Sequence, residues 1–327
     1  MNISIVVPIY NGEKFLPHLF NSLLLQSSKD FEVVFINDGS VDRSEELLLE
    51  FQKTTKDFKV VVETIKNSGQ GAARELGVRL SSNPYICFVD VDDDIEKDYV
   101  EYFSSVIDKY HPDMVCSNYF VNDSKEVKDP KFADCLLNKD EIKKDIYPYL
   151  IQNNRYQYFL PSLWAKAFRK DLYLSNVCKS DIRVGEDIAV FIPAFLRCEN
   201  VYLSSRCLYH YRVDNSSSVM KSRKPRSYSD VINLYNHLKE KLADQYQEFE
   251  LQISRLIAHV AFNCSITQFY SDRPKKEIKK FISDNLNHEI IAKAIKEMDA
   301  KGFKAKLMRY ALKHKSYCLM RLYSKVM

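Results

Sequence analysis

The 327-residue sequence has few of the features that make a chain flexible or embed it in a membrane. It holds only 7 glycines and 10 prolines, so long flexible linkers are not expected. No apolar run reaches the roughly 18 residues that cross a bilayer, and the first residues show an alternating strand pattern in place of a signal segment. We therefore expect a folded protein that stays in the cytoplasm, on the side of the membrane where it is made.

Two common signatures are also missing. The eight cysteines include no CxxC pair and no close spacing, so they are interpreted as buried small side chains in a reducing compartment, not as disulfides or zinc ligands. The stretch SGQGAAR at 68–74 lacks the third glycine of the GxGxxG fingerprint. A tight turn between a strand and a helix explains its glycines better than dinucleotide binding does.

Charge is distributed unevenly along the chain, although the net charge is only +4. Residues 275–327 carry 14 Lys and Arg against 5 Asp and Glu, whereas the first 274 residues carry 34 against 39. Residues 301–327 contain eight basic residues and no acid, with apolar residues at helical spacing. A basic amphipathic helix suits an anionic membrane surface. The alternative is a terminal helix packed on the rest of the protein with a solvated basic face.

The first 90 residues alternate between strand and helix patterns. Short apolar strands are expected at 3–7, 31–36, 58–63 and 85–89, and amphipathic helices at 13–27, 42–55 and 70–81. This alternation predicts an α/β fold with a mostly parallel sheet flanked by helices. Ligands of such sheets bind beyond the carboxyl ends of the strands.

Later segments extend this prediction. A strand is expected at 112–121, helices at 139–152 and 186–197, and a strand pair at 200–203 and 207–212. From about residue 225 onward the patterns are helical. We therefore predict a catalytic domain over 1–222, with halves at about 1–95 and 96–222, and an all-helical C-terminal region over 223–327.

Asp90 and Asp92 are the most informative strand-end residues, because they follow an apolar strand in the run FVDVDDD. Alternate residues of an extended segment face the same way, so the two carboxylates are expected to point together. Neighbouring carboxylates repel each other unless a cation lies between them. Oxygen ligands without His or Cys suit Mg²⁺ or Mn²⁺. The alternative is a solvated acidic turn.

Five ordered motifs resemble family-2 glycosyltransferases: SIVVPIYNGEKF, FEVVFINDGSVDRS, NSGQGAAREL, FVDVDDD, and the later group SLWAKAFRKDLY, GEDIAVF and YHYRVDNSSSV. The match covers roughly residues 2–220. It implies a GT-A fold and a nucleotide-sugar donor, usually a UDP-sugar. The resemblance assigns a donor site to Pro8, Tyr10, Asp38, Asn67, Arg74, Asp90, Val91 and Arg212, with Asp92 and Asp90 at the metal. A surface salt bridge is the alternative for Arg74.

Glu186 and Asp187 open a predicted helix, where carboxylates are stabilised by the helix dipole. By the resemblance, Asp187 is the general base of an inverting displacement, and Glu186 either binds the acceptor or exchanges roles with it. Trp164 and Lys166 are candidate acceptor contacts, with core packing as the alternative for the single tryptophan. His210 is either a further metal ligand or a neutral histidine of the strand pair.

The resemblance implies a metal-dependent enzyme that transfers a hexose or N-acetylhexosamine to a hydroxyl of a saccharide, expected to be lipid-linked, in capsular or other surface polysaccharide synthesis in bacteria. The QxxRW motif and membrane spans of processive relatives are missing, so one sugar is expected per encounter. There are two alternatives: a catalytically silent partner subunit of another glycosyltransferase, and a nucleotide-sugar oxidoreductase. A homo-oligomer or a partner enzyme is compatible with the sequence, and no nucleic-acid-binding motif accompanies the basic end.

Overall fold

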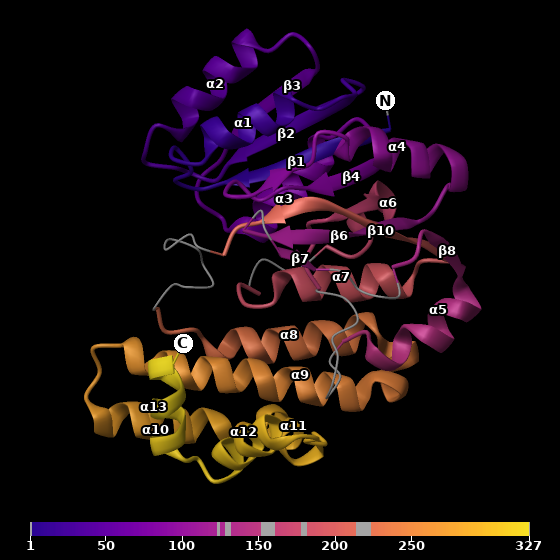
Figure 1. Ribbon diagram of the computed structural model, residues 1–327. Coiled ribbons are helices and arrows are strands. Elements are labelled where there is room, and N and C mark those ends of the chain that lie inside the picture. The colour runs from indigo at the N-terminus through magenta and orange to yellow at the C-terminus, as the bar shows by residue number, and fades with distance from the viewer. Residues whose placement is uncertain are drawn as a thin grey trace. The chain divides into compact units, whose positions relative to one another are not determined.

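The computed structural model describes residues 2–122, 125–127, 132–151, 161–177, 182–213 and 224–326 (Figure 1). Contacts divide the chain into two compact units. The first unit comprises Met1–Asp145, Ser162–Ser180 and Ala194–Ser216, and the second comprises Ile146–Pro161, Asp181–Pro193 and Ser217–Met327. The predicted boundary near residue 222 falls outside the described residues, so the division into a catalytic domain and a C-terminal region stays a prediction.

Four parallel strands form one side of the sheet in the first unit, in the order β3-β2-β1-β4. They are β1 (Ile3–Ile9), β2 (Phe31–Asn37), β3 (Lys59–Thr64) and β4 (Tyr85–Phe88). Strands β1, β2 and β4 are buried along their whole length. Burial on both faces is the reason that their sequences are almost continuously apolar. The predicted parallel sheet is therefore confirmed.

Helices cover both faces of these strands (Figure 1). They are α1 (Leu16–Leu24), α2 (Ser44–Thr54), α3 (Gln70–Leu80) and α4 (Tyr99–Tyr110). Ile5 and Val7 belong to one core with apolar residues of α1, α2 and α4. The intervening Val6 faces α3, where a Cβ added to Gly77 would lie 2.4 Å from its Cγ1 atom. Glycine at position 77 therefore lets α3 pack directly on the sheet.

The other side of the sheet is mixed. It contains β9 (Lys166–Arg169), β6 (Met114–Val121), β10 (Asn200–Tyr211) and β5 (Asp94–Ile95), with β7 (Lys125–Val127) on β6 and β8 (Cys135–Asn138) on β10. Strand β9 runs antiparallel to both β4 and β6, whereas β10 runs parallel to β6. Neither β5, β7, β8 nor β9 was expected from the sequence, because each is at most four residues long.

The predicted strand pair at 200–203 and 207–212 is wrong, because β10 is one continuous strand. Its register against β6 shifts between Leu203 and Cys207 and again before Tyr209. The intervening serines do not turn the chain. Ser205 instead donates its backbone N–H to Asp134 Oδ1 at 3.1 Å, and the extra residues are absorbed as a bulge.

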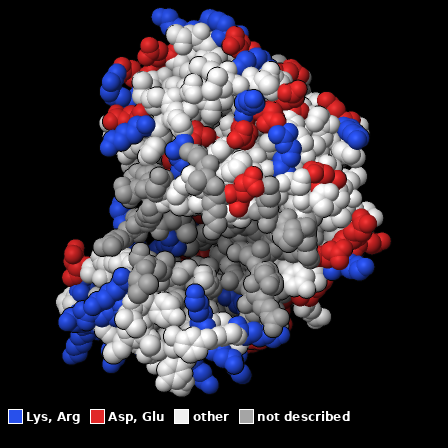
Figure 2. All heavy atoms as spheres, viewed as in Figure 1, with Lys and Arg blue, Asp and Glu red and all other residues white. Residues whose placement is uncertain are grey.

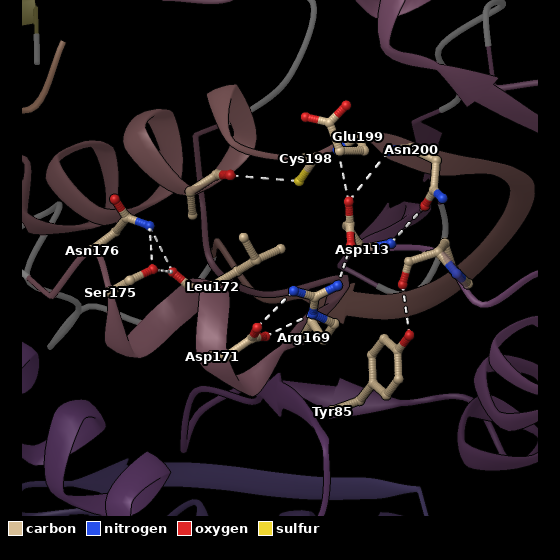
Figure 3. Close-up of polar contacts among 12 residues, drawn as sticks. Tyr85, Asp113, Arg169, Asp171, Leu172, Ser175, Asn176, Cys198, Glu199 and Asn200 are labelled. Atoms are coloured by element: carbon tan, nitrogen blue, oxygen red, sulfur yellow. Dashed lines mark hydrogen bonds and ion pairs between the residues drawn. The ribbon is translucent and has the colours of Figure 1, made fainter.

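A polar cluster around Asp113 joins β4, β9, β6 and β10 (Figure 3). Asp113 is 6% exposed, and its Oδ1 atom accepts from Arg169 Nη1 at 2.7 Å. Its Oδ2 atom accepts from the backbone N–H groups of Glu199 and Asn200, at 2.6 and 3.4 Å. Arg169 also donates to Asp171, whose carboxylate raises the pKa of the guanidinium. Each oxygen of the buried carboxylate therefore has a donor, as burial of a charge requires.

The predicted helix at 139–152 is shorter than expected. Helix α5 spans Lys139–Asp145, and a 3₁₀ turn follows at Tyr147–Tyr149. Pro148 lies in that turn and has no backbone N–H to continue an α-helical ladder. The short helix α6 (Lys170–Leu174) follows β9.

The second unit is helical, as predicted for the C-terminal region. Its helices are α8 (Tyr228–Lys241), α9 (Tyr246–Thr267), α10 (Lys275–Leu286), α11 (Glu289–Glu297), α12 (Phe303–Lys313) and α13 (Tyr317–Val326). The 22-residue helix α9 is central and contacts α8, α11, α12 and α13. No helix in the described part of the chain is both long and apolar enough to span a bilayer.

The basic C-terminal segment forms two helices in place of one. The chain turns at Lys315, which has a φ of +48°, and the backbone N–H of Ser316 bonds to Ala311 at 2.8 Å. Ala311 and Met320 are fully buried against the unit. Phe303, in contrast, is 80% exposed, although it is one of the apolar residues at helical spacing in 301–327. The segment therefore packs on α9 and still leaves apolar and basic side chains on its outer face.

Candidate functional site

The loops after β1 and β2 are tied to each other at the carboxyl edge of the sheet. The backbone N–H of Asn11 donates to Ser40 Oγ at 2.9 Å, and that of Gly12 donates to Ser44 Oγ at 2.8 Å. Pro8, inside β1, is buried, whereas Tyr10, one residue past the strand, is 53% exposed. The two predicted base contacts thus differ in access, because only Tyr10 presents its side chain to a ligand.

Asp38 shapes the loop after β3. Its carboxylate is 4% exposed and accepts the backbone N–H groups of Ser68 at 2.6 Å and Gly69 at 2.8 Å. Asn67, in the same loop, is exposed, and its backbone N would lie 2.8 Å from a Cβ on Gly39. The sequence did not predict this bracing role. By the resemblance, Asp38 holds the nucleotide base and Asn67 borders the donor site, and both roles stay predictions.

Arg74 lies beneath the acidic edge and not on the surface. Its side chain is 1% exposed, and its Nη2 atom donates to Asp90 Oδ1 at 2.9 Å. Gln70, one turn earlier in α3, donates to the same oxygen at 3.1 Å. The surface salt bridge that the sequence left as an alternative is therefore excluded. The buried guanidinium of Arg74 therefore pairs directly with a carboxylate of the acidic edge.

Asp93 is the most deeply buried member of the acidic run. Tyr209 Oη donates to its Oδ2 atom at 2.7 Å and accepts the backbone N–H of Asp90 at 3.1 Å. Burial raises the pKa of Asp93 to about 8, and the negative charges of Asp90 and Asp92 add to the rise. Asp90 and Asp92 are half-buried. Several carboxylates are thus crowded together at this edge of the sheet, and their negative charges repel one another.

Arg212 is held by an aspartate on the same edge. Its backbone N–H donates to Asp93 Oδ1 at 2.8 Å, and its Nε atom donates to Asp94 Oδ2 at 2.8 Å. His18 Nε2 lies 2.8 Å from the same Asp94 oxygen and also contacts the Arg212 guanidinium. The Arg212 side chain keeps 27% of its surface exposed. It can therefore meet an anion while Asp94 positions it.

A pocket of about 300 Å³ opens at this edge, within the first unit. Its lining contains the basic or titratable side chains of Lys14, His18 and Arg212 beside the carboxylates of Asp92 and Asp93, with Phe15 and Val91 as the apolar part. Val91 also closes on the first loop, because a Cβ on Gly12 would lie 2.8 Å from its Cγ2 atom. A pocket lined by both carboxylates and cationic side chains suits a metal ion with a diphosphate.

His210 has a partner other than a metal. Its Nε2 atom lies 2.8 Å from Glu96 Oε1, and its ring stacks on Phe120 at 4.6 Å between centroids. In the described part of the chain, no three His, Cys, Asp or Glu side chains lie together as a ready metal cage. The oxygen donors of Asp90 and Asp92 nevertheless fit Mg²⁺ or Mn²⁺, ions that bind through one or two carboxylates and take further ligands from phosphates and water.

Trp164 and Lys166 are both buried. Trp164 is 7% exposed and stacks on Tyr209 and Tyr211 at centroid distances of 4.9 and 5.0 Å. Lys166 is 5% exposed and donates to Ser162 Oγ at 3.2 Å. This geometry favours the packing alternative for Trp164. An acceptor contact of either residue stays a prediction.

Glu186 and Asp187 belong to the second unit, where they begin α7 (Glu186–Leu196) and are half-buried. Gly185 precedes them with a φ of +85°, and a Cβ there would lie 2.9 Å from Leu234 of α8. The buried His237 of α8 lies 2.9 Å, through Nε2, from the Ala189 carbonyl. The start of α7 is therefore anchored on α8 by close packing and by this hydrogen bond. The catalytic roles of the two acids stay predictions.

Sequence reasoning missed four contributors to the pocket and its edge. Lys14 and Phe15 follow β1 by a few residues, and their position past a strand end is a signal that was available. His18 carries no local signal, because its partner Asp94 lies 76 positions further along the chain. Tyr209, which links Asp90 to Asp93, could only be recognised once β10 and the acidic run were placed together.

Comparison with known structures first defines the class of the fold. The crystal structure of TarS residues 1–349 from Staphylococcus aureus, solved in complex with UDP, superimposes with a TM-score of 0.68. The two sequences are 20% identical, and the match covers 99% of this chain and 90% of that one. The mixed sheet with its helical extension is thus a GT-A fold.

The sequence comparisons then define the family. The family model described as "Glycosyl transferase family 2" matches residues 4–173. The uncharacterized glycosyltransferase EpsJ of Bacillus subtilis is 27% identical over 90% of this chain and 86% of its own length. The glycosyltransferase GlyA of Streptococcus pneumoniae is 32% identical over 66% of this chain, which spans only 31% of GlyA. The chain belongs to glycosyl transferase family 2 and is a glycosyltransferase.

Proposed function

We propose that the protein is an inverting, metal-dependent glycosyltransferase that uses a UDP-sugar. It would transfer a hexose or N-acetylhexosamine to a hydroxyl of a lipid-linked saccharide, at the cytoplasmic face of the membrane, during surface polysaccharide synthesis. The observation that carries the proposal is the pocket at the carboxyl edge of the sheet, which Asp92, Lys14 and Arg212 line together. TarS, which shares the fold, has been solved with UDP and with UDP-GlcNAc.

The residues at the edge fit a hard divalent cation. Burial raises the pKa of Asp93, and the negative charges of Asp90 and Asp92 raise it further. A cation at Asp90 and Asp92 would reduce the repulsion among these carboxylates and, when bound, would neutralise charge on the leaving diphosphate. Arg212 adds a guanidinium that Asp94 already orients. The protein thus provides a fixed positive group for the leaving group without reorganisation during the reaction.

The proposed reaction is a single displacement. Asp187, or Glu186 in the exchanged assignment, takes the proton from the acceptor hydroxyl. The hydroxyl oxygen forms a bond to the anomeric carbon while the bond from that carbon to the diphosphate breaks, and UDP leaves. Attack from the face opposite the diphosphate inverts the anomeric configuration. A positioned base contributes about 10²- to 10⁴-fold to such a step.

Release of UDP across a panel of UDP-sugars, with Mn²⁺, with Mg²⁺ and with chelator, tests the proposal. We expect turnover of one donor that requires metal and is lost in Asp187→Asn. Comparison of Asp187→Asn with Glu186→Gln identifies the base, because a general base acts only when deprotonated and only the variant of the base should lose the acidic limb of the pH profile of kcat. A folded wild type that binds no UDP in the presence of metal would overturn the proposal and favour a silent partner subunit.

A further inference from the structure

A second pocket, of about 450 Å³, lies within the helical unit. It is formed where the end of α9 and the following turn meet the start of α10 and one face of α13. Its lining is Phe269, Tyr270, Ser271, Arg273, Lys275, Ile278, Tyr317, Arg321, Ser324 and Lys325. Neither the family motifs nor the proposed transfer reaction uses any of these residues.

All the charged side chains that line this pocket are basic. Four cationic side chains line it, those of Arg273, Lys275, Arg321 and Lys325, and no carboxylate does. Within the described ranges, none of the four forms an ion pair with an acidic side chain. Figure 2 shows the corresponding gathering of Lys and Arg at the α10 and α13 end of the unit. Four neighbouring cations repel one another, so an anion among them would be stabilising.

The backbone adds to the positive potential. Lys275 is the first residue of the 12-residue helix α10, and Ile278 lies one turn further along the pocket wall. The N-terminus of a helix carries about half a positive charge and favours phosphate groups. Arg273 is fixed over the Phe281 ring at 4.4 Å, which limits the orientations of its guanidinium.

The walls of the pocket are braced against each other. Tyr270 Oη donates to the Ser324 carbonyl at 2.7 Å, which ties the turn after α9 to α13. Tyr317 packs edge-to-face on Phe269 at 4.9 Å. On α13, Tyr317, Arg321, Ser324 and Lys325 fall at helical spacing on one face. The cations of α10 and α13 are therefore held near each other before any ligand binds.

We propose that this pocket binds a phosphate or diphosphate group, and thereby forms an anion site separate from the donor site. Arginine guanidinium groups bind phosphate oxygens in a bidentate manner, and lysines add charge. The group could belong to a membrane lipid or to a soluble phosphorylated molecule. Leu322, next to Arg321 and 60% exposed, places apolar surface beside the basic face, which suits a lipid headgroup.

A pair of charge-matched double variants tests the site. Arg321→Ala with Lys325→Ala removes two cations from the pocket, and Lys304→Ala with Lys306→Ala removes two exposed cations of α12 that do not line it. Binding of inorganic pyrophosphate is measured by calorimetry on full-length protein in the presence of chelator. Both double variants keep the donor site, so any difference between them reports the second pocket. Thermal unfolding confirms that both are folded.

We expect the pocket variant to bind pyrophosphate at least 10-fold more weakly than wild type, and the α12 variant to bind within about 2-fold of it. Sedimentation with vesicles of phosphatidylcholine, with and without phosphatidylglycerol, identifies the source of the phosphate. Loss of vesicle binding only in the pocket variant assigns a lipid headgroup, and pyrophosphate binding without vesicle binding assigns a soluble ligand.

Equal weakening in the two variants would overturn the proposal, because it would show a diffuse charge effect in place of a site. So would a wild type that binds neither pyrophosphate nor anionic vesicles. The readout is binding and not sugar transfer, so a failure here leaves the proposed function untouched, and a failure of the proposed function leaves this site untouched.

Discussion

Two groups of carboxylates in the first unit have opposite surroundings. Asp113 is buried, and both its oxygens accept hydrogen bonds from Arg169 and from backbone N–H groups (Figure 3). At the acidic edge, Asp92 lines a pocket, and the buried Asp93 has a pKa raised to about 8. A carboxylate whose charge is matched inside the protein holds the fold together. A carboxylate whose negative charge is not balanced by neighbouring donors or cations can bind a ligand, such as a metal ion, that brings positive charge.

The largest effect expected from this contrast is on catalysis. Asp92→Asn should lower kcat/KM by about 10³-fold, because charge on the leaving diphosphate loses its stabilisation. The temperature of unfolding should stay the same or rise slightly, since one of several crowded negative charges is removed. Steady-state UDP release and thermal unfolding of the same preparation check both parts. A large loss of stability would mean that Asp92 is a structural residue like Asp113.

Asp113→Asn should lower stability and leave activity almost unchanged, which is the reverse of the effect expected for Asp92→Asn. It removes the charge of a buried carboxylate that pairs with the half-exposed Arg169 and accepts two backbone N–H groups, which costs about 2–3 kcal/mol of unfolding free energy. Activity per folded molecule should change less than 3-fold, because the cluster does not line the pocket. The matched control is Asp171→Asn, which removes an exposed partner of the same arginine and should cost about 1 kcal/mol or less. Denaturant unfolding in both variants gives the comparison.

Glu32 extends the comparison to pH. Burial raises its pKa, but hydrogen bonds from Lys59, Ser4 and Ser82 outweigh burial and lower it from 4.5 to about 2. The folded-state pKa is depressed, so the stabilisation is complete above about pH 4.5 and is lost as the pH falls toward 2. Glu32→Gln should therefore cost roughly 2–3 kcal/mol at pH 6 and much less near pH 2. Unfolding of wild type, Glu32→Gln and the exposed control Glu46→Gln across this range measures the difference.

Trp164→Phe is expected to have the smallest effect. If Trp164 only packs on Tyr209 and Tyr211, the smaller ring costs about 1 kcal/mol of stability and leaves the KM for the acceptor unchanged. An acceptor KM raised 10-fold or more, with normal stability, would instead support the acceptor contact for which Trp164 is a candidate. Acceptor titrations at saturating donor distinguish the two results.

The sequence predicts best where one local signal decides the structure. The first four strands and three helices lie within a few residues of their expected positions, because continuous apolar runs alternate with amphipathic ones. The short antiparallel strands β9 and β5 were not predicted, since strands of four and two residues carry little periodicity. The motif residues after β4 were identified correctly as an acidic edge, because two acids flank an apolar residue at strand spacing.

Sequence reasoning could not predict the contacts between residues that are far apart in the chain. Arg74 is expected near the donor, but its burial and its bond to Asp90 depend on α3 packing on β1 and β2. Asp38 is expected to bind a base, yet it also braces the loop after β3 through two backbone N–H groups. The serines at 204 and 205 resemble a turn, and only the contacts with Asp134 show why the strand continues through them. Each of these depends on tertiary packing and not on local propensity.

The order in which the two units are threaded along the chain has a consequence for how the protein is made. Helix α7 passes from the second unit to the first between Pro193 and Ala194, and Ile146–Pro161 belongs to the second unit as well. A ribosome that has reached residue 222 has therefore produced two segments whose helical partners do not yet exist. In a truncated chain the buried Ile151, for example, would lack the Gln252 side chain of α9, whose Oε1 atom accepts its backbone N–H at 3.0 Å. We therefore expect these segments to complete their folding only after the helical unit has been synthesised.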